Sequence, residues 1–164
     1  MANRIAVVET NKGTLRFELL EEDAPKATEN FRLLAEKEYY NDVIFHRVIK
    51  NFMIQGGDPL GEGYGGESAW GGRFDDEIDR SSDLYKGVYE KGTVAMANSG
   101  PNTNGSQFFI MHIDYPLPPS YVKFGKVVSG QEVVDSIAEI ETNHKDKPLE
   151  PVVMERVYIE EAAS

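Results

Sequence analysis

The stretch Phe45–Asp58 reads FHRVIKNFMIQGGD, and the interpretation of the whole chain depends on it. It sets one histidine and one arginine, Arg47, beside Phe, Met and Gln side chains, with no acid before Asp58. It offers neither an obvious nucleophile nor a cluster of metal ligands. Any chemistry performed here would therefore have to use a cation in apolar surroundings.

The composition of the chain predicts one soluble domain over residues 1–164. Hydrophobic residues make up 40% and charged residues 27%, which is ordinary for a globular protein. A net charge of −11 argues against nucleic acid as a partner, because phosphate binding needs clustered Lys and Arg. No apolar run approaches the roughly 18 residues that cross a membrane. The strand-like N-terminus shows no long apolar run of the kind found in signal peptides and the chain lacks cysteine, so we expect a cytoplasmic protein. Its acidity is expected to keep it monomeric.

The first elements follow from periodicity. Ile5–Thr10 and Thr14–Leu20 form a predicted hairpin around Asn11-Lys12-Gly13, because apolar and polar residues alternate in the second run. A helix follows, with Asp23 as its expected cap and Pro25 in its first turn. Its expected buried face is made by four side chains at helical spacing: Ala27, Phe31, Leu34 and Ala35.

A second helix is predicted from the capping box Ser129-Gly-Gln-Glu132, with Val133, Val134, Ile137 and Ala138 on its buried face. Between and after the helices lie short strand-like runs: Phe52–Gln55, Thr93–Ala97, Gln107–Met111, Val122–Val128 and Val152–Ile159. Two helices among many short strands favour an antiparallel barrel or sandwich with capping helices. The irregular segment Pro59–Gly92 is long enough to be functional or mobile.

Cofactor and metal motifs are weak in this chain. Gly61–Gly66 matches GxGxxG, but no strand precedes it and no helix follows it, so a dinucleotide site is not expected. His46, His112 and His144 lie far apart with no metal-binding spacing. We therefore expect no metal and no cofactor.

A second block, Met96–Ile110 (MANSGPNTNGSQFFI), adds to the first, and with Pro25–Phe31 and Phe124–Val127 it resembles the cyclophilins over nearly the whole chain. The resemblance implies a mainly β fold, a closed eight-stranded antiparallel β-barrel capped by two α-helices. It also implies a cofactor-independent peptidyl-prolyl cis–trans isomerase, a single-domain member of prokaryotic type. Its expected partners are proline-containing peptides and unfolded protein clients, which it would help to fold.

The resemblance also implies roles for individual residues. Arg47 would be the catalytic cation, Gln55 would orient it and the substrate, and Asn98 would hold the substrate backbone through its main chain. The proline pocket would be lined by Phe52, Met53, Phe109 and Leu117. Ala97 and Gln107 would border the groove, Tyr121 would lie where many members carry histidine, and the neighbouring pocket would have a rim of Arg73, Ser99 and Thr103.

Two alternatives remain open at this stage. Phe52, Met53 and Phe109 would be read as ordinary core residues if the two blocks were not present together. A proline-peptide binding module or chaperone with little turnover is the other function that fits, although the chain keeps Arg47. The loop before Phe124 holds no tryptophan, which in the family contacts cyclosporin, so only weak cyclosporin binding is expected.

Overall fold

Nine β-strands and two α-helices make up the fold in a computed structural model that describes residues 3–161. The helices are α1 (Pro25–Glu36) and α2 (Gln131–Ala138), and one 3₁₀ turn covers Asp83–Tyr85. The strands are β1 (Ile5–Thr10), β2 (Gly13–Leu19), β3 (Val43–Ile44), β4 (Arg47–Ile49), β5 (Met53–Gly56), β6 (Thr93–Met96), β7 (Phe108–Met111), β8 (Lys123–Ser129) and β9 (Val153–Glu160). In the described part of the chain no helix is long and apolar enough to cross a membrane.

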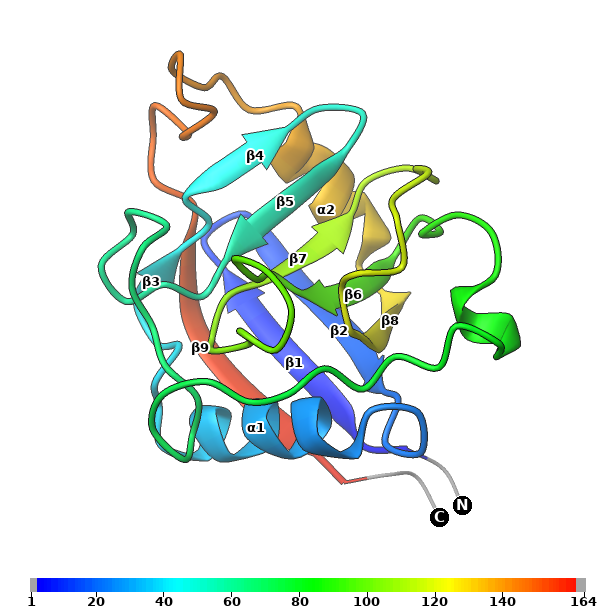
Figure 1. The fold of residues 1–164 in the computed structure, drawn as a ribbon. Coiled ribbons are helices and arrows are strands. Elements are labelled where there is room, and N and C mark those ends of the chain that lie inside the picture. The colour runs from blue at the N-terminus through cyan, green and yellow to red at the C-terminus, as the bar shows by residue number, and fades with distance from the viewer. Residues whose placement is uncertain (1–2, 162–164) are drawn as a thin grey trace.

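All strands belong to one antiparallel sheet in the order β3-β9-β1-β2-β8-β6-β7-β5-β4. Its two edge strands, β3 and β4, are consecutive in the chain and only Phe45 and His46 separate them. The sheet therefore curls until the run from 43 to 49 closes it, as Figure 1 shows. The expected antiparallel barrel is confirmed as a curled sheet whose edge strands β3 and β4 do not pair with each other, and the strand count is nine instead of eight.

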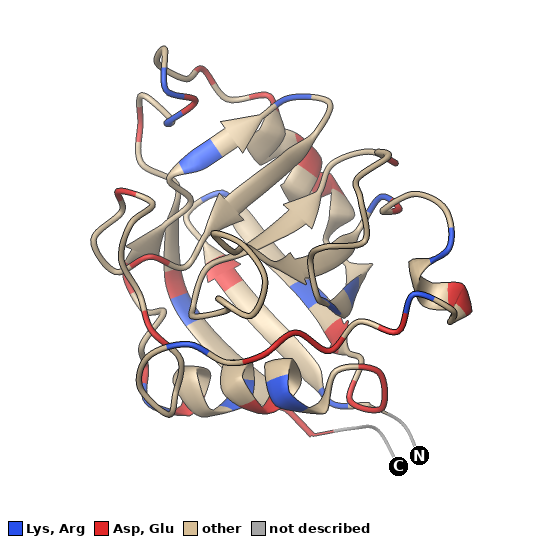
Figure 2. Cartoon of the chain, in the orientation of Figure 1, with Lys and Arg blue, Asp and Glu red and all other residues tan. Residues whose placement is uncertain are grey.

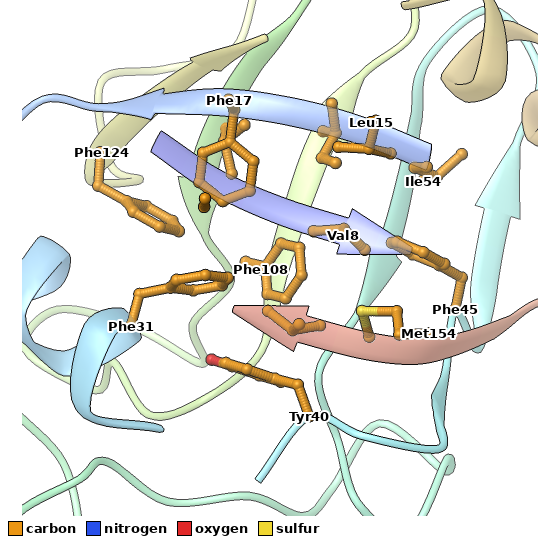
Figure 3. Packing of buried hydrophobic residues seen from close by; sticks show 14 of the residues in the cluster. Val8, Leu15, Phe17, Phe31, Tyr40, Phe45, Ile54, Phe108, Phe124 and Met154 are labelled. Carbon is orange, nitrogen blue, oxygen red and sulfur yellow. The ribbon is translucent and has the colours of Figure 1, made fainter. Parts of the chain in front are cut away.

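The interior of the barrel is packed with aromatic side chains. Phe17, Phe31 and Phe124 meet with ring centroids 5.3 to 6.0 Å apart, and Tyr40 stacks on Phe31 at 4.9 Å. Figure 3 shows these rings converging from α1 and from several strands. Leu15, Phe17 and Leu19 of β2 all point into this core, as their alternation predicts.

The outer face of β5, β6 and β7 is also covered. Met53, Tyr89, Ala95, Phe109 and Met111 form a second cluster, separate from the main core. Every residue of β6 and β7 is consequently buried, and neither strand shows polar alternation. This second cluster is the floor on which the candidate site is built.

Helix α1 packs along β9 and β8 and buries the four predicted side chains. The expected cap by Asp23 is wrong, because Ala24 occupies the cap position and makes no side-chain bond there. The carboxylate of Glu77 caps the helix instead, accepting hydrogen bonds from the backbone N–H of Lys26 (2.7 Å) and Ala27 (2.9 Å). Figure 2 shows the acidic segment that carries Glu77 running alongside the helix.

Helix α2 packs on β2, β4 and β5 and also buries the four predicted residues. The predicted capping box is wrong, since Ser129 is the last residue of β8 and pairs with Arg16. Gly130 takes the cap position with a φ of 84°, a left-handed conformation that favours glycine. A Cβ there would also meet the backbone of Thr14 and Leu15, so this position requires glycine.

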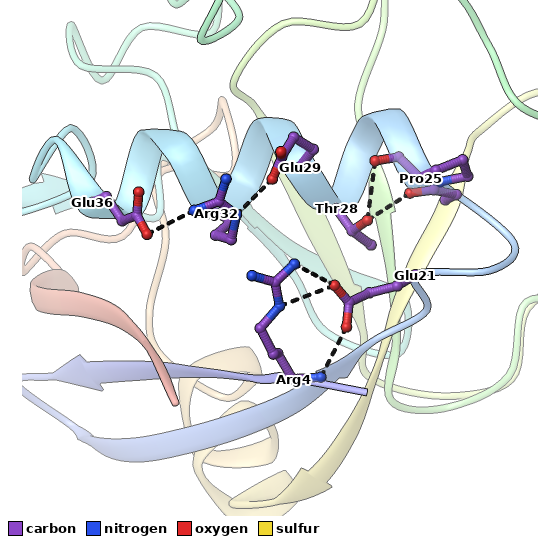
Figure 4. A network of polar contacts seen from close by, with 8 residues as sticks. Arg4, Glu21, Pro25, Thr28, Glu29, Arg32 and Glu36 are labelled. Atoms are coloured by element: carbon purple, nitrogen blue, oxygen red, sulfur yellow. Dashed lines mark hydrogen bonds and ion pairs between the residues drawn. The ribbon is translucent and has the colours of Figure 1, made fainter. Parts of the chain in front are cut away.

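Ion pairs fix the start of β1 and the outer face of α1. The guanidinium of Arg4 binds the carboxylate of Glu21, which also accepts the Arg4 backbone N–H at 3.0 Å. Arg32 bridges Glu29 and Glu36 on the exposed side of the helix. Figure 4 shows the two groups of contacts side by side. The Arg4–Glu21 pair joins the turn before the helix to the start of β1, whereas both ion pairs of Arg32 lie within α1.

Candidate active site

One row of residues crosses four neighbouring strands and places Arg47 beside the second cluster. Arg47 lies opposite Gln55, Gln55 opposite Phe109, and Phe109 opposite Ala95. Residues that are directly paired across antiparallel strands project from the same face, with Cβ atoms about 4.5–5.5 Å apart. The ladder therefore sets a cation, an amide and an aromatic ring in one line on the outer face of the sheet.

A cavity of about 120 Å³ opens beside this row. Its lining combines the row with residues from the turn before β5 and from two loops: Arg47, Phe52, Met53, Gln55, Ala97, Asn98, Phe109, Leu117 and Tyr121. All nine are residues that the sequence singled out. Met53 and Phe109 are only 1% and 4% exposed, so they are core residues of the second cluster and cavity wall at once.

The guanidinium of Arg47 is exposed at the edge of the cavity. Between residues 3 and 161 no carboxylate forms an ion pair with it, whereas Arg4, Arg16 and Arg32 all have acidic partners. Its donors are thus free to meet a molecule in the cavity. A cation beside apolar side chains can stabilise a polar group that becomes more basic during a reaction.

The side chain of Gln55 is held by a chain of amide hydrogen bonds. Its Nε2 donates to Oε1 of Gln107 at 3.1 Å, and Nε2 of Gln107 donates to the carbonyl of Gly65 at 3.1 Å. The side-chain oxygen of Gln55, Oε1, makes no hydrogen bond within the described residues, which leaves it available to Arg47 or a ligand. The sequence predicted Gln107 at the border of the groove, but not this contact.

A second cavity, of about 300 Å³, shares Gln55, Ala97 and Asn98 with the first. Arg73, Ser99 and Thr103 line it, as the resemblance implied, together with Tyr64 and Gly65, which the sequence analysis missed. Tyr64 is 93% exposed at its rim. No pattern in the sequence marks Tyr64, because it lies in a glycine-rich loop without periodicity.

Asn98 lines both cavities and a third groove next to Tyr121. Its Nδ2 donates to the carbonyl of Ser120 at 2.9 Å, and its Oδ1 accepts the backbone N–H of Gly100 at 3.1 Å. The side chain is therefore occupied in joining two loops. The role implied for the main chain of Asn98, to hold the substrate backbone, stays a prediction.

Tyr89 supports the floor of the site and was not identified from the sequence. Its hydroxyl donates to the carbonyl of Tyr121 at 2.6 Å, and Lys123 Nζ lies 4.3 Å from its ring centroid. Lys123 is buried, and burial lowers its pKa. Tyr89 lies in a segment before β6 that shows no periodic pattern of apolar residues, so its supporting role could be found only from the three-dimensional structure.

His46, next to Arg47, has the surroundings of a structural residue and not of a catalytic one. It is 7% exposed and its Nδ1 is buried without a hydrogen-bond partner among the described residues. Burial lowers the pKa of His46, which keeps the ring neutral. No group of three potential metal ligands gathers anywhere in residues 3–161.

Comparison with known proteins bears on this geometry. The family model of the cyclophilin type peptidyl-prolyl cis-trans isomerases matches residues 5–159. The chain is 46% identical over 157 residues to peptidyl-prolyl cis-trans isomerase-like 1 of Emericella nidulans, covering 95% of this chain and 94% of that protein. It is 47% identical over 152 residues to peptidyl-prolyl cis-trans isomerase-like 3 of Gallus gallus, covering 92% of each.

Comparison with solved structures points to the same family. The fold matches a cyclophilin type peptidyl-prolyl cis-trans isomerase of Cryptosporidium parvum with a TM-score of 0.90 and 40% identity, covering 98% of this chain and 99% of that one. A second structure of the same protein, in the presence of the dipeptide Ala-Pro, matches with a TM-score of 0.87. The relatives named here are eukaryotic, and the expected prokaryotic type stays a prediction.

Proposed function

The chain belongs to the cyclophilin-type peptidyl-prolyl cis–trans isomerases, and from this premise we propose that it rotates X–Pro bonds in the 120 Å³ cavity, with Arg47 as the catalytic cation. The observation that carries the proposal is a guanidinium that has no acidic partner within residues 3–161, in line with Gln55 and Phe109 at the edge of a cavity that Phe52, Met53 and Leu117 also line. The other family residues implied by the sequence line the same two cavities.

Such a site suits this reaction because isomerisation makes and breaks no covalent bond. The two isomers differ by only about 0.5–1 kcal/mol, so no energy source is needed. The obstacle is a rotation barrier of about 18–20 kcal/mol, which comes from amide resonance. As the bond twists, the prolyl nitrogen becomes pyramidal and gains a lone pair. A donor aimed at that nitrogen stabilises the twisted state more than either planar state.

The magnitudes are consistent with this assignment. Reducing a relaxation of tens of seconds to about a millisecond requires roughly 10⁴-fold, or about 5–6 kcal/mol. One preorganised donor in a dry site supplies about 2.7–4 kcal/mol. The remainder is assigned to the apolar walls, which desolvate the amide and anchor the proline ring.

The remaining roles follow from position. Phe52, Met53, Phe109 and Leu117 hold the proline ring, and Gln55 orients Arg47 and the substrate. The main chain of Asn98 binds the substrate backbone, because its side chain is occupied by Ser120 and Gly100. Crystallisation of the Cryptosporidium parvum relative in the presence of Ala-Pro supports a proline dipeptide as the minimal ligand.

The physiological setting is part of the proposal. We assign the protein to the cytoplasm, as a monomer that acts on unfolded protein clients. Support comes from the absence of cysteine and from the net charge of −11, which keeps copies of a protein apart.

The alternative is a module that binds proline peptides with little turnover. An NMR exchange measurement on an Ala-Pro peptide separates the two, because a binding module would broaden peptide signals without connecting the cis and trans resonances. Exchange accelerated by catalytic amounts of protein supports the isomerase. Binding without acceleration would support the alternative.

A further inference from the structure

Asp58, directly after β5, is an acid that the proposed chemistry does not use. It is fully buried, at 0% exposed, and no ion pair to it exists within residues 3–161. Its Oδ1 accepts the backbone N–H of Leu60 at 2.9 Å. Its Oδ2 accepts those of Glu62 (3.0 Å), Gly63 (2.7 Å) and Gly65 (3.1 Å). Burial opposes its ionisation, but these four donors outweigh burial and lower the pKa of Asp58.

The carboxylate thus organises a loop that has little other support. Residues 60–65 belong to no helix or strand, and Gly61 and Gly63 adopt left-handed φ values of 66° and 93°. Four backbone donors within six residues converge on one side chain. The loop closes so tightly around it that a Cβ on Gly65 would overlap Asp58 Oδ1.

The far end of this loop reaches the site. Gly65, whose N–H binds Asp58, offers its carbonyl to Nε2 of Gln107 at 3.1 Å. Oε1 of Gln107 accepts from Nε2 of Gln55, also at 3.1 Å. Three hydrogen bonds in series therefore join the buried carboxylate to the amide that lies opposite Arg47.

We propose that Asp58 is a positioning residue of the isomerase, which fixes the orientation of Gln55 through Gly65 and Gln107. The inference rests on the proposed roles of Arg47 and Gln55. Its effect falls on turnover and not on proline binding. Phe52, Met53 and Phe109, which hold the ring, belong to β5, its preceding turn and β7, and none of them depends on the loop.

Asp58→Asn is the informative substitution because it keeps the size of the side chain. Its new NH₂ group must face either the N–H of Leu60 or the three N–H groups at the other oxygen. In both orientations a hydrogen-bond donor faces a donor, and at least one hydrogen bond is lost. The loop then shifts and the chain to Gln55 loosens. Because a misplacement of about 1 Å costs up to about 100-fold, we expect kcat to fall about tenfold while KM stays within about twofold.

The test compares wild type, Asp58→Asn, Gln107→Ala and the double variant on an Ala-Pro peptide, by NMR exchange at several peptide concentrations. If Asp58 acts through Gln107, the double variant is no slower than Gln107→Ala alone. Asp79→Asn is the matched control. This exposed aspartate also accepts a backbone N–H, from Ser81, but has no link to Gln55, so kcat of the control variant should be unchanged.

Wild-type kcat in a folded Asp58→Asn variant would overturn the proposal, and so would independent losses that multiply in the double variant. If Asp58→Asn does not fold, Gly65→Ala disturbs the same contact while keeping the carboxylate. Wild-type kcat in that variant would also overturn the proposal. Arg47→Ala, measured alongside, tests the proposed function separately: full activity there would remove Arg47 from the mechanism without affecting the coupling of Asp58 to Gln107.

Discussion

Arg47 on β4 lies directly opposite Gln55 on β5, in the shortest paired strand of the site, three residues long. The pairing fixes where the cation projects, although Arg47 itself has no ion-pair partner in the described chain. The direction in which Arg47 projects is therefore set by the backbone ladder. This arrangement leaves its charge for the substrate.

Replacing Arg47 tests whether that charge does the chemistry. Arg47→Ala should lower kcat/KM by about tenfold to a hundredfold in a protein that still folds, because an exposed arginine is rarely a folding determinant. Arg47→Lys should not restore activity, since a point charge lacks the planar fork of donors. A protease-coupled assay with an Ala-Pro peptide measures both.

Arg16→Ala is the matched control, because Arg16 is also a strand arginine on the surface but pairs with Glu160 away from both cavities. Its activity should equal that of wild type. Near-wild-type activity in a folded Arg47→Ala variant would contradict the mechanism.

The pH dependence separates His46 from the chemistry. No titrating group takes part in the proposed reaction, so kcat/KM should be nearly flat from about pH 6 to pH 9. An inflection near pH 6.5 that disappears in His46→Gln would show that the histidine is catalytic.

Stability should depend on His46 instead. Burial lowers its pKa in the folded protein, so the unfolded chain takes up the proton first as the pH falls. Folding free energy is therefore lost below about pH 6.5, the ordinary value, as the pH falls toward the lowered pKa. Urea unfolding at pH 7.5 and pH 5 should show a smaller difference for His46→Gln than for wild type. An equal difference would contradict this assignment.

The elements that the sequence predicted are those with a local signal. The β1–β2 hairpin and the buried faces of both helices follow from alternation and helical spacing. Strands β3 and β4 were missed because two and three residues are too few to show a period. The cap of α1 could not be predicted locally, because Glu77 comes from about fifty residues away in the chain.

The site was predicted through two family blocks, and not through residue patterns. Met53 and Phe109 are buried enough to be ordinary core residues, so patterning alone could not have separated the two roles. Tyr64 and Tyr89 were not predicted because they lie in an irregular segment outside both blocks. Their contribution depends on contacts made across the fold.

The cap of α1 gives a test of the fold that does not involve the site. Glu77→Ala removes an acceptor for two backbone N–H groups and a negative charge from the helix N-terminus. It should lower the free energy of unfolding by about 0.5–2 kcal/mol. Asp23→Ala is the control, because Asp23 makes no capping bond, and it should change stability by less than about 0.5 kcal/mol. Urea unfolding of the two variants measures both changes. Equal losses of unfolding free energy would contradict the assignment of the cap to Glu77.

Cyclosporin binding should be weak, although the isomerase should be active. The family's tryptophan donates an indole N–H to this ligand and covers its apolar face, and the loop before Phe124 contains none. The only tryptophan, Trp70, packs edge-on against Phe74 and lines neither cavity. Pro116, in the register of the missing residue, has no N–H to offer, and the ring of Tyr115 lies tilted against that of Phe52 with centroids 4.5 Å apart.

Losing a donor to a buried ligand acceptor costs about 1–3 kcal/mol, which corresponds to a roughly tenfold to hundredfold weaker Kd than that of tryptophan-bearing relatives. Pro116→Trp should recover part of this loss, because Pro116 is exposed in the loop beside Leu117, which lines the cavity. Turnover of an Ala-Pro peptide should change little, since Arg47 and the proline-binding side chains remain. Calorimetric titration of wild type and Pro116→Trp with cyclosporin tests both statements, and nanomolar binding by the wild type would refute the first.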